Sequence, residues 1–185
     1  MKQAMYGLLL YVFLILPPVA NLLESIMIVH MHMQIPLLVI SGFLMAPFLQ
    51  RKFPHFFGKW NSNGVAGMLL LMIVWSYWMI PRAMDEAITV QAVEIFKFIS
   101  LPFLVGVPLR DSWSRLGGIG KGIIYVYIML VLMVMAWLYI GSDDQICNNY
   151  LEVDQKTLGW GSLAMSACMI IYGIQLMVVD QSQYK

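Results

Sequence analysis

Long apolar runs separated by short polar connections dominate the chain. Crossing a hydrocarbon core of about 30 Å takes about 20 helical residues. No run alternates apolar and polar residues over ten-residue segments, which disfavours a membrane β-barrel. The pattern therefore predicts an all-α polytopic membrane bundle of about six transmembrane helices in one integral membrane domain, residues 1–185. These helices are expected at about residues 5–23, 25–49, 64–80, 90–109, 122–140 and 160–179.

Prolines interrupt three of the runs, at Pro17-Pro18, Pro36 and Pro102. A proline lacks the backbone N–H that a helix interior uses. In a membrane, such a break is tolerated when neighbouring groups satisfy the freed carbonyl. We therefore expect kinks at these positions. Aromatic residues near the ends of runs, Trp78 and Tyr139 among them, are expected in interfacial belts.

The composition excludes a water-soluble globule. The 185 residues are 61% hydrophobic and only 11% charged, whereas soluble domains carry about 25% charged residues. So few polar side chains cannot cover a surface in water. The net charge of +1 gives no electrostatic reason to expect nucleic-acid binding. The lipid bilayer is the expected environment.

The charges divide unevenly between the two sets of connections. With six crossings, one side holds eight basic residues: Lys2, Arg51, Lys52, Lys59, Arg110, Arg115, Lys121 and Lys185. The other side holds Arg82 and Lys156 among seven acidic residues: Glu24, Asp85, Glu86, Asp143, Asp144, Glu152 and Asp154. The positive-inside rule then predicts a multi-pass protein of the cell's inner (plasma) membrane with both termini in the cytoplasm.

The second run carries histidine and methionine residues near its outer end. Positions that share a helix face there carry Met27, His30, Met31 and Gln34. Thioether and imidazole ligands suit Cu(I). His32 lies on another face of a regular helix, unless Pro36 distorts that helix. Packing is the alternative interpretation, because methionine fills irregular cores and a membrane histidine can bond to a neighbouring helix.

Glu94 and Lys97 lie within the fourth run. Their i,i+3 spacing allows them to pair on one helix face. A charge inside the membrane costs at least a few kcal/mol, so neither residue is expected without a partner. Two interpretations remain open: a neutralising pair that holds the bundle together, or a proton or metal relay.

Acidic residues also mark the outer rim, including Asp85 and Asp154. They either gather cations or serve as solvated loop positions and helix caps, and Asp85 is expected to cap a short outer helix. No nucleophile–base motif or phosphate-binding loop is present, so no enzyme activity is expected. The two cysteines, Cys147 and Cys168, are too few for a disulfide framework or a zinc site.

Three stretches resemble the CtaG-type family of cytochrome c oxidase assembly factors. They are His30-Met31 with the segment Pro36 to Gly42, then Trp78 to Ala87 with Val90 to Gly106, and finally Asp154-Gln155 with Gly161 to Met165. The resemblance implies copper handling on the outer side. It implies His30 as the central ligand with Met27 and Met31 beside it, contributions from His32 and Met165, and Glu94 as an orienting or neutralising group.

The chain departs from that family pattern at several positions. Ile26, Gln91 and Ile95 stand where the family has histidines, and one of the usual seven spans is absent. Three functions therefore remain open. The first is a CtaG-like protein that assists copper delivery to, or assembly of, a haem-copper respiratory oxidase. The others are a non-catalytic accessory subunit of a larger respiratory or copper-containing membrane complex, and a haem- or quinone-binding membrane protein.

Overall fold

The chain is helical throughout its regular structure in a computed structural model that describes residues 2–142 and 144–178. No strand occurs among these residues. The α-helices are α1 Lys2–Ile15, α2 Pro17–Glu24, α3 Met27–Val29, α4 Ile35–Lys52, α5 Pro54–Trp60, α6 Val65–Trp78, α7 Pro81–Thr89, α8 Gln91–Ser100, α9 Val107–Arg115, α10 Gly118–Gly141 and α11 Glu152–Val178. Two π-helical segments, η1 His30–Gln34 and η2 Leu101–Gly106, join helices end to end. Asp143, Lys185 and the predicted helix end at residue 179 lie outside the described residues.

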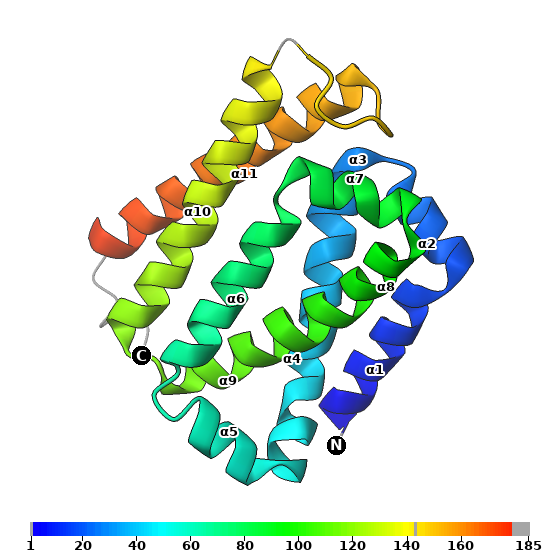
Figure 1. The fold of residues 1–185 in the computed structure, drawn as a ribbon. Helices are drawn as coiled ribbons and strands as arrows, with labels where there is room; N and C mark the ends of the chain where they lie inside the picture. Colours follow the sequence, from blue (N-terminus) through cyan, green and yellow to red (C-terminus); the bar gives the residue numbers. More distant parts are fainter. Residues whose placement is uncertain (1, 143, 179–185) are drawn as a thin grey trace.

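Four continuous helical stretches are long and apolar enough to cross a membrane: Met27–Lys52, Gln91–Arg115, Gly118–Gly141 and Glu152–Val178. Two more candidates are bent pairs, α1 with α2 at 72° and α6 with α7 at 71°. The described chain therefore contains four to six candidate spans (Figure 1). This confirms an all-helical, multi-pass membrane protein.

The prolines act in two different ways. Leu16 has an extended ψ of 126° immediately before Pro17, and the chain turns sharply between α1 and α2. At Pro36 and Pro102 the helices continue instead, through π-helical turns. A proline cannot donate to the carbonyl four residues earlier, and a widened turn is a common local response to such a missing bond. Of the three predicted kinks, only the one at Pro17-Pro18 is therefore a sharp bend.

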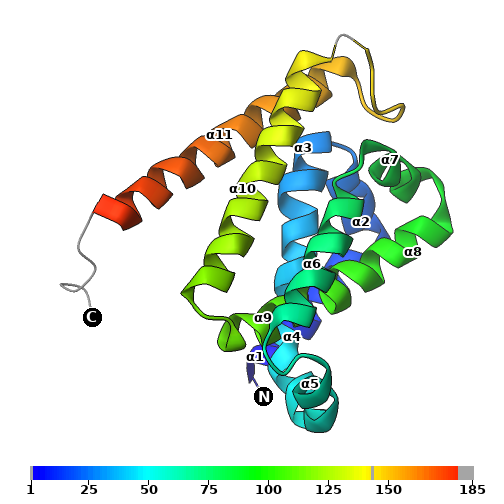
Figure 2. The same cartoon turned by 60° about the vertical axis from the view of Figure 1, so that its left-hand side comes forward.

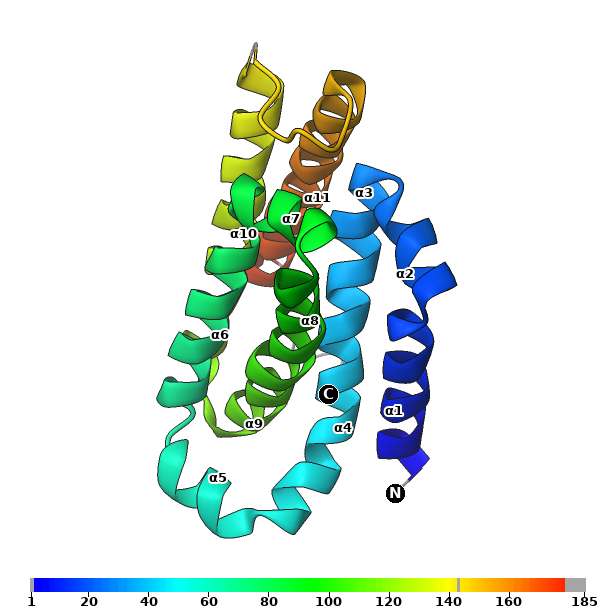
Figure 3. The same ribbon diagram turned by 45° about the vertical axis from the view of Figure 1, so that its right-hand side comes forward.

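The helix α4 crosses η2 at very close range. A Cβ atom on Gly42 would lie 1.9 Å from the carbonyl oxygen of Pro102, and one on Gly106 would lie 2.2 Å from that of Val39. Only glycine allows two backbones to approach so closely, as at many membrane helix contacts. On its other side α4 packs along α1 (Figure 3). These contacts fix α4 between α1 on one side and η2 with α9 on the other.

The main buried cluster joins α1, α3, η1, α4, α6, α7 and η2 to the upper parts of α10 and α11 and their connection, while α10 and α11 pack mainly on each other. Figure 2 shows α11 crossing α10 and then running away from the other helices. Trp78 and Tyr139 belong to the buried cluster rather than to interfacial belts. The Trp78 indole donates a hydrogen bond of 2.8 Å to Ser100, and the Tyr139 hydroxyl lies 3.7 Å from the Cys147 sulfur. The belt prediction is therefore wrong for these two residues.

The bundle has two distinct ends. Figure 1 shows α5 at one end, and α7 with the connection between α10 and α11 at the other. The helix α5 carries Lys59 and follows Arg51 and Lys52, whereas α7 carries Asp85 and Glu86. The elements that carry the basic and acidic groups are therefore separated along the bundle axis.

Candidate functional site

A buried ion pair joins α2 to α8. The Lys97 ammonium donates to Glu24 Oε1 at 2.6 Å, and the two side chains are 0% and 7% exposed. The sequence pattern predicted Glu94 as the direct partner of Lys97 and placed Glu24 in an exposed connection. The direct partner is instead the buried Glu24, and Glu94 acts on Lys97 only at longer range. The bend before Pro17 turns α2 so that its last residue, Glu24, reaches the side of α8. Two charges removed from water require a close partner of this kind.

Two further groups hold Glu24 in place. Gln34, at the end of η1, donates its side-chain N–H to the same Glu24 oxygen at 3.0 Å. The Tyr150 hydroxyl, from the connection between α10 and α11, donates to the Glu24 backbone carbonyl at 2.7 Å. Burial raises the pKa of the Tyr150 phenol, so this hydroxyl stays protonated and acts as a donor. Glu24 therefore ties four segments of the chain together.

His30 lies beside this ion pair and is fully buried. Its imidazole is close enough to Lys97 for their charges to interact. Neither ring nitrogen forms a well-aligned hydrogen bond among the described residues, and the same holds for Gln34 Oε1, although the Gln34 side chain lies close enough to interact with the ring. Buried polar atoms are normally paired, so these orphaned atoms call for a ligand, an ion or water.

Two thioether side chains accompany His30. Met27 and Met31 are both buried in the main cluster, on the same stretch of helix as His30. Together with Gln34 they form the buried surface expected from their spacing. The donors around His30 are therefore one imidazole and two polarisable sulfur atoms, a set that suits a soft monovalent ion.

The expected ligands His32 and Met165 lie elsewhere. His32 Nε2 is 3.1 Å from the Ser162 hydroxyl on α11, so this histidine bonds to a neighbouring helix. The widened turn at η1 does not bring His32 to the His30 side. Met165 is 43% exposed on α11, outside the enclosed core around His30. His30 thus shares a buried stretch of helix with Met27 and Met31, whereas His32 and Met165 lie against or on α11.

A polar pocket of about 320 Å³ opens beside Glu24 at the end of the bundle that carries α7. Its walls include Asn21, Ser25 and the half-buried carboxylate of Glu94. Among the described residues, Glu94 forms no ion pair with Lys97 or another cation. The pocket reaches Glu24, Glu24 contacts Gln34 and Lys97, and these residues adjoin His30. A series of polar side chains therefore links the wall of the pocket to the surroundings of the buried imidazole.

Asp85 and Asp154, the two aspartates expected at the outer rim, form hydrogen bonds with the connection between α10 and α11. Asp85 lies in the middle of α7, and the residue that precedes this helix is Ile80, so the predicted cap is wrong. Its carboxylate instead accepts hydrogen bonds from Asn148 at 3.2 Å and from the Asn149 side chain at 2.7 Å. Asp154, in the first turn of α11, accepts from the Leu151 N–H at 3.3 Å. Both aspartates position the connection that carries Tyr150.

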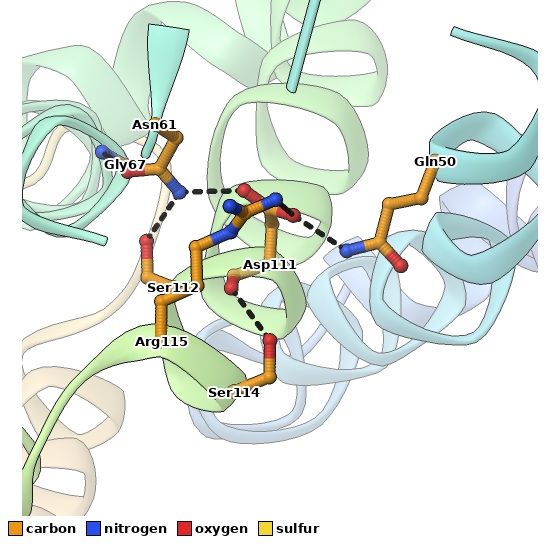
Figure 4. Close-up of polar contacts among 7 residues, drawn as sticks. All are labelled: Gln50, Asn61, Gly67, Asp111, Ser112, Ser114 and Arg115. Atoms are coloured by element: carbon orange, nitrogen blue, oxygen red, sulfur yellow. Dashed lines mark hydrogen bonds and ion pairs between the residues drawn. The ribbon is translucent and has the colours of Figure 1, made fainter. Parts of the chain in front are cut away.

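A second buried polar cluster lies near the other end of the bundle (Figure 4). Asp111 is fully buried and accepts hydrogen bonds from Gln50 and Asn61, each at 2.7 Å, and from Arg115 at 3.2 Å. Asn61 also donates to Ser112 at 3.0 Å and accepts from the Gly67 N–H at 2.8 Å. With its donors and acceptors matched, this cluster acts as a structural clamp.

Among the described residues, no three His, Cys, Asp or Glu side chains lie close enough to hold a metal ion. The set at His30 contains one histidine and two methionines, and methionine does not belong to those four residue types. The sequence did not reveal the buried role of Glu24, its bond from Gln34 or the part played by Tyr150, because these contacts depend on the bend of α2 and on the long connection. No protein-family model, curated protein or solved structure matches this chain.

Proposed function

We propose that this membrane protein binds Cu(I) at His30, with the thioethers of Met27 and Met31 as further ligands. The observation that carries the proposal is the fully buried imidazole of His30, whose ring nitrogens form no well-aligned hydrogen bond among the described residues and have the Gln34 side chain as a polar neighbour. Its neighbours Met27 and Met31 supply soft donors, which favour Cu(I) over harder ions. The protein passes the ion on by ligand exchange and catalyses no reaction.

The electrostatics of the site are compatible with a monovalent cation. Lys97 alone would repel an ion at His30, but Glu24 contacts the ammonium at 2.6 Å and offsets its charge. At the pocket, Glu94 adds a carboxylate that has no cation within ion-pair distance among the described residues, although it interacts with Lys97 at longer range. A carboxylate at a pocket mouth raises the local concentration of cations. The pocket is therefore the proposed route of access for copper.

The destination of the copper is proposed from the family resemblance. A CtaG-like role would deliver the ion to a haem-copper respiratory oxidase during its assembly. The positive-inside rule places the acidic end of the bundle, with the pocket, on the outer side of the plasma membrane. Both termini then lie in the cytoplasm. In this orientation the protein receives copper from the outer side.

The test is a Cu(I) titration of the purified protein against bicinchoninate, a chromogenic Cu(I) chelator. All variants carry Cys147→Ser and Cys168→Ser, because thiols also bind Cu(I). We expect one Cu(I) per chain, lost in His30→Ala and weakened in Met27→Leu. The control His55→Ala, at an exposed histidine of α5, keeps full binding. A protein that stays copper-free, or binds equally well without His30, contradicts the proposal.

The rival haem function has a direct readout in the same sample. A haem protein shows a Soret band in its absorption spectrum as purified. We expect no such band. Its presence in stoichiometric amount would replace the copper proposal by haem ligation at His30.

A second candidate function, that of an accessory subunit, is favoured by the packing of α11. None of its residues 167–178 is buried in the described chain, and Gln175 is among the exposed ones. Polar side chains of a membrane span usually face protein. A partner complex would cover this half of the helix. Co-purification with a large membrane enzyme in fixed stoichiometry supports that function, whereas isolation as a stable free monomer in mild detergent contradicts it.

A further inference from the structure

A groove of about 710 Å³ runs between the diverging parts of α10 and α11, far along the chain from His30. Its walls include Tyr125 and Tyr172 and are otherwise mainly aliphatic and glycine residues. Figure 2 shows the two helices separating on this side. Two glycines of α10, Gly118 and Gly122, line the groove, and a Cβ atom on either would meet no atom within 4 Å. The absence of side chains there leaves the groove open.

One cation lies on this otherwise apolar groove. The Lys121 ammonium is 5.5 Å from the centroid of the Trp113 ring, and both residues line the groove. Among the described residues no carboxylate lies within ion-pair distance of Lys121. A tryptophan beside a lysine is typical of the headgroup level of a membrane. The groove therefore combines apolar walls with a positive charge that has no acidic partner in the described chain.

We propose that this groove binds one anionic phospholipid. Its acyl chains lie along the apolar walls of α10 and α11, and its phosphate group contacts the Lys121 ammonium. Both helices qualify as membrane spans, so the groove is accessible to lipid from the side. The charge of Lys121 selects an anionic headgroup over a zwitterionic one. This site is independent of copper binding at His30.

The test is native mass spectrometry of the full chain in detergent, titrated with phosphatidylglycerol or with phosphatidylcholine of identical acyl chains. We expect one phosphatidylglycerol per chain, retained about fivefold better than phosphatidylcholine, as expected for one lysine at an anionic headgroup. Lys121→Gln removes this preference. The matched control Lys59→Gln, at an exposed lysine of α5 outside the groove, keeps it.

A second variant tests the apolar part of the groove. Gly122→Leu places an aliphatic side chain in the open space, and leucine favours a helix more than glycine does, so the fold is retained. We expect loss of both lipids, with an unchanged circular dichroism spectrum. Glycerol 3-phosphate, which has the headgroup charge without acyl chains, does not compete.

Three results would overturn the proposal. One is equal loss of preference in Lys59→Gln and Lys121→Gln. Another is retention of the lipid by folded Gly122→Leu. The third is protection of Lys121 from chemical acetylation by a co-purifying protein instead of by lipid.

Discussion

The buried pair of Lys97 and Glu24 gives the sharpest test of the packing. The two side chains are 0% and 7% exposed, so solvent screens their attraction little. Removing one partner of a buried ion pair leaves an uncompensated charge and costs about 3–5 kcal/mol. Lys97→Met is expected at the lower end, about 3 kcal/mol, because Gln34 still donates to Glu24. Glu24→Leu is expected near the upper end, since Lys97 and Gln34 both lose their acceptor.

The double variant Glu24→Leu/Lys97→Met removes both charges together. We expect its loss in the free energy of unfolding to be at least about 2 kcal/mol smaller than the sum of the two single losses, because the effects of contacting residues are not additive. The assay is the free energy of unfolding in detergent micelles, measured by steric trapping. As a control, Arg82→Gln breaks the exposed ion pair with Glu86 and should leave the free energy of unfolding nearly unchanged. Additive losses in the double variant, within about 0.5 kcal/mol, would refute a direct contact of Glu24 with Lys97.

Three further predictions follow from other parts of the fold. Gly42→Leu places a side chain where a carbonyl oxygen lies 1.9 Å from the expected Cβ. It should lower the free energy of unfolding by at least about 1–3 kcal/mol. The control Gly58→Ala, with no atom within 4 Å of the added Cβ, should not lower it. Asn61→Ala removes three hydrogen bonds of a buried cluster and should cost about 1–3 kcal/mol in the same assay, with unchanged copper binding as its control. Burial raises the pKa of the Cys147 thiol and of the Tyr150 phenol above their ordinary values, so the folded state favours their neutral forms. The midpoint of thermal unfolding should therefore be steady at neutral pH and fall as the pH rises above about 8.5, the ordinary thiol pKa. Cys147→Ser should reduce that fall. A midpoint that rises with alkaline pH would contradict this prediction.

The apolar runs predicted the helical architecture because helix length and hydropathy are local properties. The candidate spans therefore lie close to the predicted ones. The prolines marked where helices are disturbed, but not how. Whether a proline bends the chain, as at Pro17, or produces a π-helical turn, as at Pro36, depends on what packs around the freed carbonyl.

Contacts between distant segments could not be read from spacing. Helical periodicity offered Glu94 as the partner of Lys97, three residues away, whereas the structure supplies Glu24 from 73 residues away. That contact exists because of the 72° bend between α1 and α2, and no local pattern encodes the direction of a bend. Trp78 was misplaced for a similar reason, since its hydrogen bond to Ser100 requires α8 as a neighbour. In contrast, the buried surface around His30 follows from positions within one helix.

The most direct test of the copper site is X-ray absorption at the copper K-edge of the Cu(I)-loaded protein, in the Cys147→Ser/Cys168→Ser background. We expect copper to be coordinated directly by one imidazole nitrogen and two thioether sulfurs. In His30→Ala the nitrogen scattering of the imidazole ring should disappear. A shell of oxygen atoms only, or an identical spectrum in His30→Ala, would contradict a copper site centred on His30.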